Sequence, residues 1–342
     1  MTRARDVADT QDNLGGAVAP FVAGKNAVIN GGFDIWQRGT SFSSQSSFSA
    51  NSADRWANYR GSVVVGENIT QQSPGATLSQ FRYCARVQRA SGNTSTESLN
   101  FNNILETNDS LRFAGQSVVI SFYARAGSNY SSASNALGVS VQSGQGIDQN
   151  PTTGFTSSNN FIVTTATLTT SWQRFTATAT CPTATTQLAV LINYTPTGTA
   201  GANDYYEITG VQLELGAVAT PFSRAGGSIG GELALCQRYY WRSPSLVNNH
   251  LGLGFGRSTT GTRTGVALPV QMRVAATSVD FANLNVANTV SGFSVTSLTL
   301  AFSSPNYPTV DANVASGLTQ FSPYFLVDAG SGTGYIGFSA EL

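Results

Sequence analysis

Apolar and polar residues alternate with a period of two in several short segments of this chain. In residues 118–125, Val-Val-Ile-Ser-Phe-Tyr-Ala-Arg, the even-numbered side chains are apolar and share one face, while Tyr123 and Arg125 lie on the other. This pattern predicts a strand with one buried face. Further strands are predicted at residues 63–69, 81–88, 137–142, 161–168, 172–180, 187–194 and 205–215.

Loops rich in Ser, Asn and Gly separate these segments, and no run suits a long amphipathic helix. Short strands at this spacing are typical of an antiparallel jelly-roll β-sandwich. Residues 26–39 look like the opening strand of the domain, and residues 205–222 contain its closing strand. Gly210, inside the closing strand, is a candidate for a kink or bulge. The first β-domain is therefore predicted over residues 26–225.

A second domain is indicated by the glycines and small residues of 225–231, which interrupt the strand pattern. Residues 232–242 favour a short helix that runs into a strand, because the run Tyr-Tyr-Trp at 239–241 prefers a strand. Further strands are predicted at residues 251–255, 265–275, 278–284, 293–302, 319–327 and 334–340. We expect a second, smaller C-terminal β-sandwich over residues 226–342, so the predicted fold class is all-β.

The first 25 residues differ from the rest in composition. Charges alternate near the start, and Gly15, Gly16 and Pro20 follow. A segment this polar buries little surface by itself, so we expect an N-terminal extended arm that orders against a partner, or else an unstructured tail. The residues taken to anchor the arm are Arg3, Arg5, Asp6 and Phe21.

The net charge is zero, with 18 basic and 18 acidic residues among 342, so no long-range attraction to nucleic acid is expected. Lys25 is the single lysine; the arginine bias suits interfaces or glycan contacts, or reflects compositional bias. The three cysteines show no paired spacing and are expected to be buried thiols. No apolar run suits membrane insertion, and the start lacks a signal-peptide core, so synthesis in a cytoplasm is expected.

The chain offers little catalytic chemistry. His250 is the only histidine, which leaves a Ser/His/Asp or metal site without partners. Glycoside hydrolysis needs two carboxyl groups roughly 5–10 Å apart. The acidic residues that a jelly roll would bring together have structural explanations as turn caps or arginine partners. The acidic residues in question are Asp34, Asp54, Glu207 and Glu214. We therefore expect no enzyme activity.

Four motifs occur in a fixed order in this chain: Asn30-Gly-Gly-Phe-Asp-Ile-Trp-Gln-Arg-Gly39, Ala53-Asp-Arg-Trp56, Val211-Gln-Leu-Glu-Leu-Gly-Ala-Val-Ala-Thr-Pro-Phe222 and Leu235-Cys-Gln-Arg-Tyr-Tyr240. At these motifs the chain resembles virion proteins of tailed bacteriophages, of the tail-fibre, head-fibre or appendage type. Residues 26–222 also look like the carbohydrate-binding-module jelly rolls found beside glycoside hydrolases. The resemblance spans most of the chain.

The resemblance implies a virion surface protein, made in the host cytoplasm, whose arm attaches to the capsid or tail hub. It also implies a homotrimer. Jelly rolls of the carbohydrate-binding type often hold a structural calcium, for which Asp34 and Glu214 are the candidate ligands. No other cofactor is implied.

A glycan site needs an exposed aromatic ring beside polar groups. Trp36 and Trp56 lie in motifs that indicate core packing. Tyr123 and Arg125, on the outward face of their strand, are the better candidates for contact with a host-surface glycan. The competing interpretation is that this face meets a neighbouring subunit or solvent.

The expected function is adhesion by a phage fibre or surface appendage, anchored by its arm and contacting host-surface polysaccharide. Three alternatives stay open: a capsid decoration protein without a receptor role, a free carbohydrate-binding protein, and a polysaccharide-degrading tailspike. A free binding protein needs no arm, and a tailspike would release reducing ends from host glycans.

Overall fold

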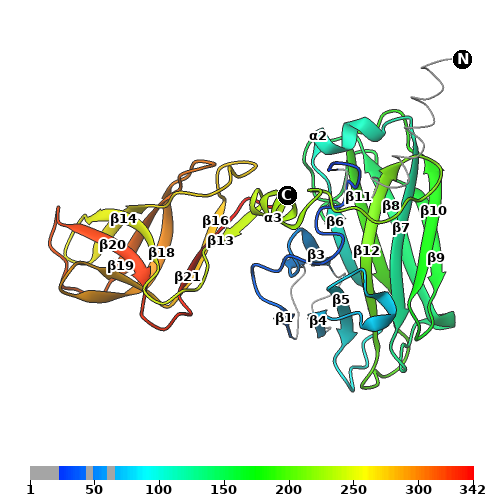
Figure 1. The fold of residues 1–342 in the computed structure, drawn as a ribbon, viewed down its shortest axis with the longest axis horizontal. Coiled ribbons are helices and arrows are strands. Elements are labelled where there is room, and N and C mark those ends of the chain that lie inside the picture. Colours follow the sequence, from blue (N-terminus) through cyan, green and yellow to red (C-terminus); the bar gives the residue numbers. More distant parts are fainter. Residues whose placement is uncertain (1–22, 44–48, 60–65) are drawn as a thin grey trace, which may run out of the picture. The chain divides into compact units, whose positions relative to one another are not determined.

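A computed structural model describes residues 23–43, 49–59 and 66–342. In these residues the chain is all-β with a few short helices, which confirms the predicted fold class (Figure 1). The chain divides into two compact units. The first extends to Leu235 and includes Leu342, and the second spans Cys236–Glu341.

The first unit contains two six-stranded antiparallel sheets, here named sheet A and sheet B. Sheet A has the order β1 (Ser41–Phe42), β4 (Glu67–Gln72), β5 (Cys84–Arg89), β12 (Tyr205–Leu215), β7 (Ser117–Ala126) and β10 (Gln173–Thr180). Sheet B has the order β2 (Ser49–Asn51), β3 (Trp56–Tyr59), β6 (Leu99–Ile104), β11 (Gln187–Tyr194), β8 (Ala136–Gly144) and β9 (Asn159–Thr167). From β5 to β8 each successive strand crosses to the other sheet, which is the winding of a jelly roll. The connections carry the short helices η2 (Ala76–Leu78), α2 (Thr107–Ser110), η3 (Leu111–Phe113) and η4 (Ala133–Asn135).

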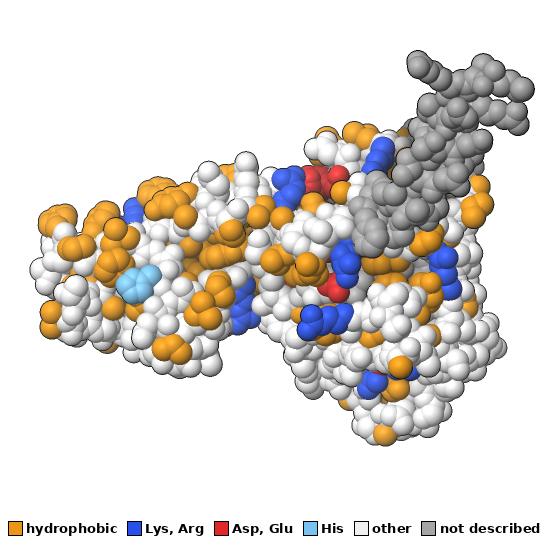
Figure 2. All heavy atoms as spheres, in the orientation of Figure 1, with side chains coloured by type: hydrophobic (Ala, Val, Ile, Leu, Met, Phe, Trp, Pro, Cys, Tyr) orange, Lys and Arg blue, Asp and Glu red, His pale blue; other side chains and the backbone are white. Residues whose placement is uncertain are grey.

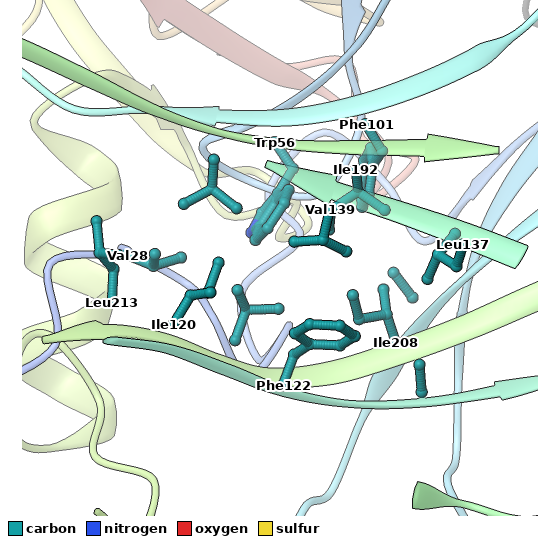
Figure 3. Packing of buried hydrophobic residues seen from close by; sticks show 14 of the residues in the cluster. Val28, Trp56, Phe101, Ile120, Phe122, Leu137, Val139, Ile192, Ile208 and Leu213 are labelled. Carbon is teal, nitrogen blue, oxygen red and sulfur yellow. The ribbon is translucent and has the colours of Figure 1, made fainter. Parts of the chain in front are cut away.

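The core of the jelly roll lies between the two sheets, where the inward residues of the alternating strands meet (Figure 3). Each large side chain that is removed from water here stabilises the fold by about 1.5–3 kcal/mol. Trp56 and Phe101 stack with ring centroids 4.9 Å apart, so Trp56 is core, as its motif predicts. The labelled core residues of Figure 3 are Val28, Trp56, Phe101, Ile120, Phe122, Leu137, Val139, Ile192, Ile208 and Leu213.

The opening stretch 26–39 is not a strand, contrary to the sequence-based prediction. Its backbone forms turns, with positive φ at Asn30 and Phe33. The Asn26 side chain attaches it to β12 by donating to the carbonyl of Val211 and accepting from the backbone N–H of Leu213. Two backbone hydrogen bonds, from Ala27 N–H to the Leu213 carbonyl and from Val211 N–H to the Gly31 carbonyl, add to these side-chain bonds without forming a regular ladder.

The glycine-rich segment 226–231, where we expected the second domain to begin, belongs to the first unit. It leads into helix α3 (Ile229–Gln237). The buried carboxylate of Glu232, in the first turn, accepts hydrogen bonds from the backbone N–H groups of Gly226 and Asn30. Burial raises the pKa of Glu232. The start of α3 is thereby held to the opening stretch of the jelly roll.

The second unit begins with the end of α3 and β13 (Tyr240–Arg242), which confirms the expected helix followed by a strand. Strands β14 (His250–Gly256), β15 (Gly261–Gly265), β19 (Thr309–Val314), β18 (Gly292–Phe302), β17 (Leu284–Ala287) and β20 (Pro323–Asp328) form a closed barrel. A separate sheet has the order β13, β21 (Tyr335–Ser339), β16 (Ser278–Ala282).

The barrel differs from the second β-sandwich that we expected. Strand β20 pairs with β14 on one side and with β17 on the other, so the sheet closes on itself instead of stacking as two layers. Its interior is filled by apolar side chains, among them Leu284, Val310 and Leu326. Closure removes the open strand edges that a sandwich of this size would leave.

Candidate functional site

The outward face of sheet A carries both of the predicted glycan-contacting residues. Tyr123 and Arg125 are two residues apart on β7, so they share this face, and both are partly exposed. Tyr123 lies opposite Thr209 on β12 and Arg174 on β10. Arg125 lies opposite Glu207 on β12. The structure thus places the two candidates as neighbours on the same face of β7.

Tyr123 lines a hollow of about 290 Å³ with two other aromatic rings. The ring of Phe81 lies 5.4 Å from the Tyr123 ring at an angle of 59°, and 5.0 Å from the Phe222 ring at 60°. Such tilted and edge-on contacts are the favoured geometry of aromatic pairs. The hollow is near the lower end of the roughly 300–1,000 Å³ range of small-molecule sites. Its complete lining is Gln80, Phe81, Tyr123, Pro221, Phe222, Arg224 and Gly227.

Gly210 makes this arrangement of rings possible. The ladder between β12 and β7 shifts register between Thr209 and Gln212, and Gly210 has φ +61°, so the predicted bulge is confirmed. A Cβ at Gly210 would lie 2.4 Å from Cζ of Phe81 and 3.1 Å from the Tyr123 ring. The bulge therefore leaves the space that the two rings occupy.

An arginine–glutamate–arginine row runs beside the hollow. Glu207 is fully buried and accepts from Nε and Nη2 of Arg86, at 2.9 and 2.6 Å, and from Nε of Arg125. The guanidinium of Arg86 stacks 3.9 Å from the ring centroid of Tyr205, and that of Arg125 lies 4.8 Å from Trp172. Stacking and ion pairing fix both guanidiniums in place. The predicted pairing of Glu207 with arginine is confirmed.

Arg174 completes the face on β10. It is exposed, and its guanidinium lies 5.8 Å from the ring centroid of Tyr123. Its Nη2 donates to the hydroxyl of Ser121 and to the carbonyl of Thr220. Within the described part of the chain no carboxylate pairs with Arg174.

A second, smaller hollow of about 140 Å³ lies on the outward face of sheet B. Asn102 is 4% exposed, and its Oδ1 has no hydrogen-bond partner among the described residues. The hollow contains amide side chains but no aromatic ring. Its lining is Asn100, Asn102, Gln142, Pro151, Thr152 and Leu191.

The two candidate calcium ligands each have partners of their own. Asp34 accepts from Nε of Arg224 at 2.8 Å. Glu214 accepts from the hydroxyl and backbone N–H of Thr220 and from Gln212, and lies 3.8 Å from Nζ of Lys25. In the described ranges no group of three or more acidic, histidine or cysteine side chains is placed to hold a metal ion. The calcium site stays a prediction.

The remaining candidates are placed as follows. Arg3, Arg5, Asp6 and Phe21 lie outside the described residues. His250 begins β14 and is exposed; it is the pale blue side chain at the surface in Figure 2. Asp54 accepts from the backbone N–H of Gln37, the capping role expected of it.

No helix in the described segments is long and apolar enough to cross a membrane.

Sequence reasoning missed Phe81 and Phe222 as members of the site. Phe81 begins the predicted strand 81–88 but precedes the observed β5, and Phe222 follows β12, so strand alternation does not place either ring beside Tyr123. The one signal in the sequence is Gly210, because a glycine inside a strand marks a bulge or a close approach of another group.

No protein-family model and no curated protein matches this sequence. Among solved structures, a protein described as "CBM4 structure and function" is 20% identical and covers 55% of this chain and 99% of its own, at a TM-score of 0.35. TmCBM61, solved in complex with β-1,4-galactotriose, is 13% identical over 56% of this chain and 99% of its own, at a TM-score of 0.33. A domain of tailspike protein 4 from Bacteriophage CBA120 is 12% identical over 56% of this chain and 21% of its own, at a TM-score of 0.34. These similarities are too weak to assign a fold or a role to this chain. The jelly roll is assigned from the strand order of the two sheets.

Proposed function

We propose that the jelly roll binds a host-surface polysaccharide through the aromatic hollow around Tyr123, as the adhesive domain of a tailed-bacteriophage surface protein. The proposal that this domain binds a glycan is based on one observation: three aromatic rings meet in a hollow of sheet A. The apolar C–H face of a sugar ring packs on such rings, while its hydroxyls reach the side chains of Gln80 and Arg224 at the rim. Each contact is weak, and several copies on one particle raise the avidity by roughly 10²–10⁴-fold.

The binding test is affinity electrophoresis of the full chain through gels that contain polysaccharide from candidate host surfaces. Retardation of the wild-type chain and its loss in Tyr123→Ala support the proposal. Tyr307→Ala, at a tyrosine in the second unit that is 52% exposed, is the matched control and should leave migration unchanged. Loss of retardation in Asn102→Ala, with Tyr123→Ala unaffected, would move the site to sheet B.

The proposal that the protein is part of a phage particle is based on the order of the four sequence motifs and on the composition of residues 1–25. In this proposal the arm docks on the capsid or tail hub, the protein is a homotrimer, and it acts by adhesion rather than catalysis. Gold-labelled antibody against the chain should decorate purified particles in electron micrographs, and the position of the label separates head from tail. Deletion of residues 1–25 should abolish incorporation, whereas a free carbohydrate-binding protein would be absent from particles altogether.

A further inference from the structure

The acidic side chains of the sheet A face are covered, whereas its basic side chains reach the surface. The side chains of Asp34, Glu207 and Glu214 are at most 6% exposed. The side chains paired with them are 18–31% exposed, and Arg174 is exposed without a carboxylate partner among the described residues. The cationic side chains are Lys25, Arg86, Arg125, Arg174 and Arg224.

This face differs from the chain as a whole. The whole chain has a net charge of zero. Among the described residues, the five cations of this face meet three carboxylates, and burial hides the carboxylates from an approaching ligand. Because the cations of this face outnumber its carboxylates and lie nearer the surface, an approaching ligand encounters a positive field.

The arginines also keep hydrogen-bond donors for a ligand. Arg125 donates to Glu207 through Nε, and Arg174 donates to protein acceptors through Nη2. The other guanidinium N–H groups of these two residues have no acceptor among the described residues. The guanidinium of Arg125, which is held by the Glu207 ion pair and by stacking on Trp172, can bind a carboxylate in the two-pronged geometry through Nη1 and Nη2, at little further cost in side-chain entropy. Arg174, whose Nη2 is engaged, offers single hydrogen bonds from its other N–H groups.

We infer that the sheet A face selects an acidic polysaccharide, one that carries carboxylate groups such as those of uronic acids. This inference rests on the proposed function and names the class of its ligand. Two residues on one face of a strand lie about 7 Å apart, so a sugar ring on Tyr123 has its own carboxylate, or that of the next sugar, within reach of Arg125 and Arg174. The aromatic hollow supplies the contact with the sugar ring, and the arginines supply the selection for charge.

The test compares acidic polymers with their own neutral derivatives. The full chain is titrated with polygalacturonate, alginate and hyaluronate, and with the carboxyl-reduced form of each, by isothermal calorimetry at low and moderate salt. We expect at least one acidic polymer to bind about tenfold or more tightly than its reduced form, with an advantage that shrinks as salt rises. Arg174→Gln should remove most of this advantage and leave the affinity for the reduced polymer unchanged. Arg257→Gln, at an exposed arginine of the second unit, is the matched control.

The outcomes separate the inference from the proposed function. Equal affinity for acidic and reduced polymers overturns the charge selection and leaves glycan binding in place. An acidic preference that survives Arg174→Gln and Arg125→Gln also overturns it, because the selection would then arise elsewhere. If no polymer of either kind binds, the proposed function fails together with the inference. Thermal melts of each variant show whether the fold is retained.

Discussion

The ring of Phe81 occupies the position that a side chain at Gly210 would need, with Cζ of Phe81 2.4 Å from where the Cβ would lie. Gly210 also has φ +61°, a conformation that favours glycine. The backbone bulge on β12 and the aromatic hollow are therefore one feature, in which a single residue sets the ring positions.

Gly210→Ala should displace Phe81 and Tyr123, because backbone on both sides prevents β12 from moving away. We expect a loss of about 1–3 kcal/mol in the free energy of unfolding and a strong loss of polysaccharide binding. Urea unfolding and affinity electrophoresis measure the two effects. Gly198→Ala is the matched control, because Gly198 has the same φ of +61° with nothing within 4 Å of its Cβ position. If both variants bind alike, the ring positions do not depend on Gly210.

Arg89 and Asp204 form an ion pair in which both side chains are 0% exposed, at 2.9 Å. Arg89 also donates to the carbonyls of Asn93, Ser95 and Gly198. Arg89→Met leaves the Asp204 carboxylate buried without its cation, so we expect the jelly roll to lose about 3–5 kcal/mol in urea unfolding.

The comparison for this variant is Arg257→Met, which removes an arginine that is 49% exposed in the ion pair with Asp311. Exposed pairs of this kind contribute about 0–1 kcal/mol. Equal losses in the two variants would mean that burial does not set the strength of the Arg89 interaction.

The Asn26 side chain bridges the opening stretch and β12. It donates to the carbonyls of Val211 and Ser223, and accepts from the backbone N–H groups of Val28 and Leu213. Asn26→Ala leaves these buried groups without partners, at about 1–3 kcal/mol for each one that finds no substitute. We expect a clear fall in the urea midpoint, whereas Asn203→Ala, at an exposed loop asparagine, should change it little.

Acid should weaken the second unit through Asp311. The side-chain hydrogen bond from Arg263 lowers the pKa of Asp311 from its ordinary 3.8. A carboxylate whose pKa is lower in the folded state stabilises the fold above its unfolded pKa, and this stabilisation is lost as the pH falls through the folded value. Calorimetric melts of the chain should therefore show the melting temperature of this unit falling below about pH 4.

Asp311→Asn should reduce the slope of melting temperature against pH in that range. Glu97→Gln, at an exposed carboxylate of the jelly roll, should leave the slope of the second unit as it is. A slope that is unchanged in Asp311→Asn would assign the acid sensitivity to other carboxylates.

Local sequence patterns predicted the strands best where both alternation and bounding turns were clear. Strands β11 and β12 begin and end at the predicted residues, 187–194 and 205–215. The opening stretch 26–39 misled the prediction, because turns, the Asn26 side chain and two isolated backbone hydrogen bonds to β12 hold it in place of a regular ladder. Closure of the barrel depends on β20 pairing with two strands distant in sequence, and no local pattern carries that information.

The site was partly predictable for the same reason. The period of two put Tyr123 and Arg125 on the outward face of β7, and the glycine at 210 indicated a bulge. Phe81, Phe222 and Arg174 come from other segments, and only the folded sheet brings them to Tyr123. Burial of Glu207 beneath two arginines also depends on the register of three strands, which alternation alone does not specify.

The measurement that tests the central claim most directly is hydrogen–deuterium exchange of the full chain with and without the polysaccharide that it binds. The account predicts slower exchange in the segments that carry Phe81, Tyr123 and Phe222, with no change around Asn102 or in the second unit. Protection confined to sheet B or to the barrel, or none while calorimetry shows binding, would contradict the assignment of the glycan site to the sheet A face.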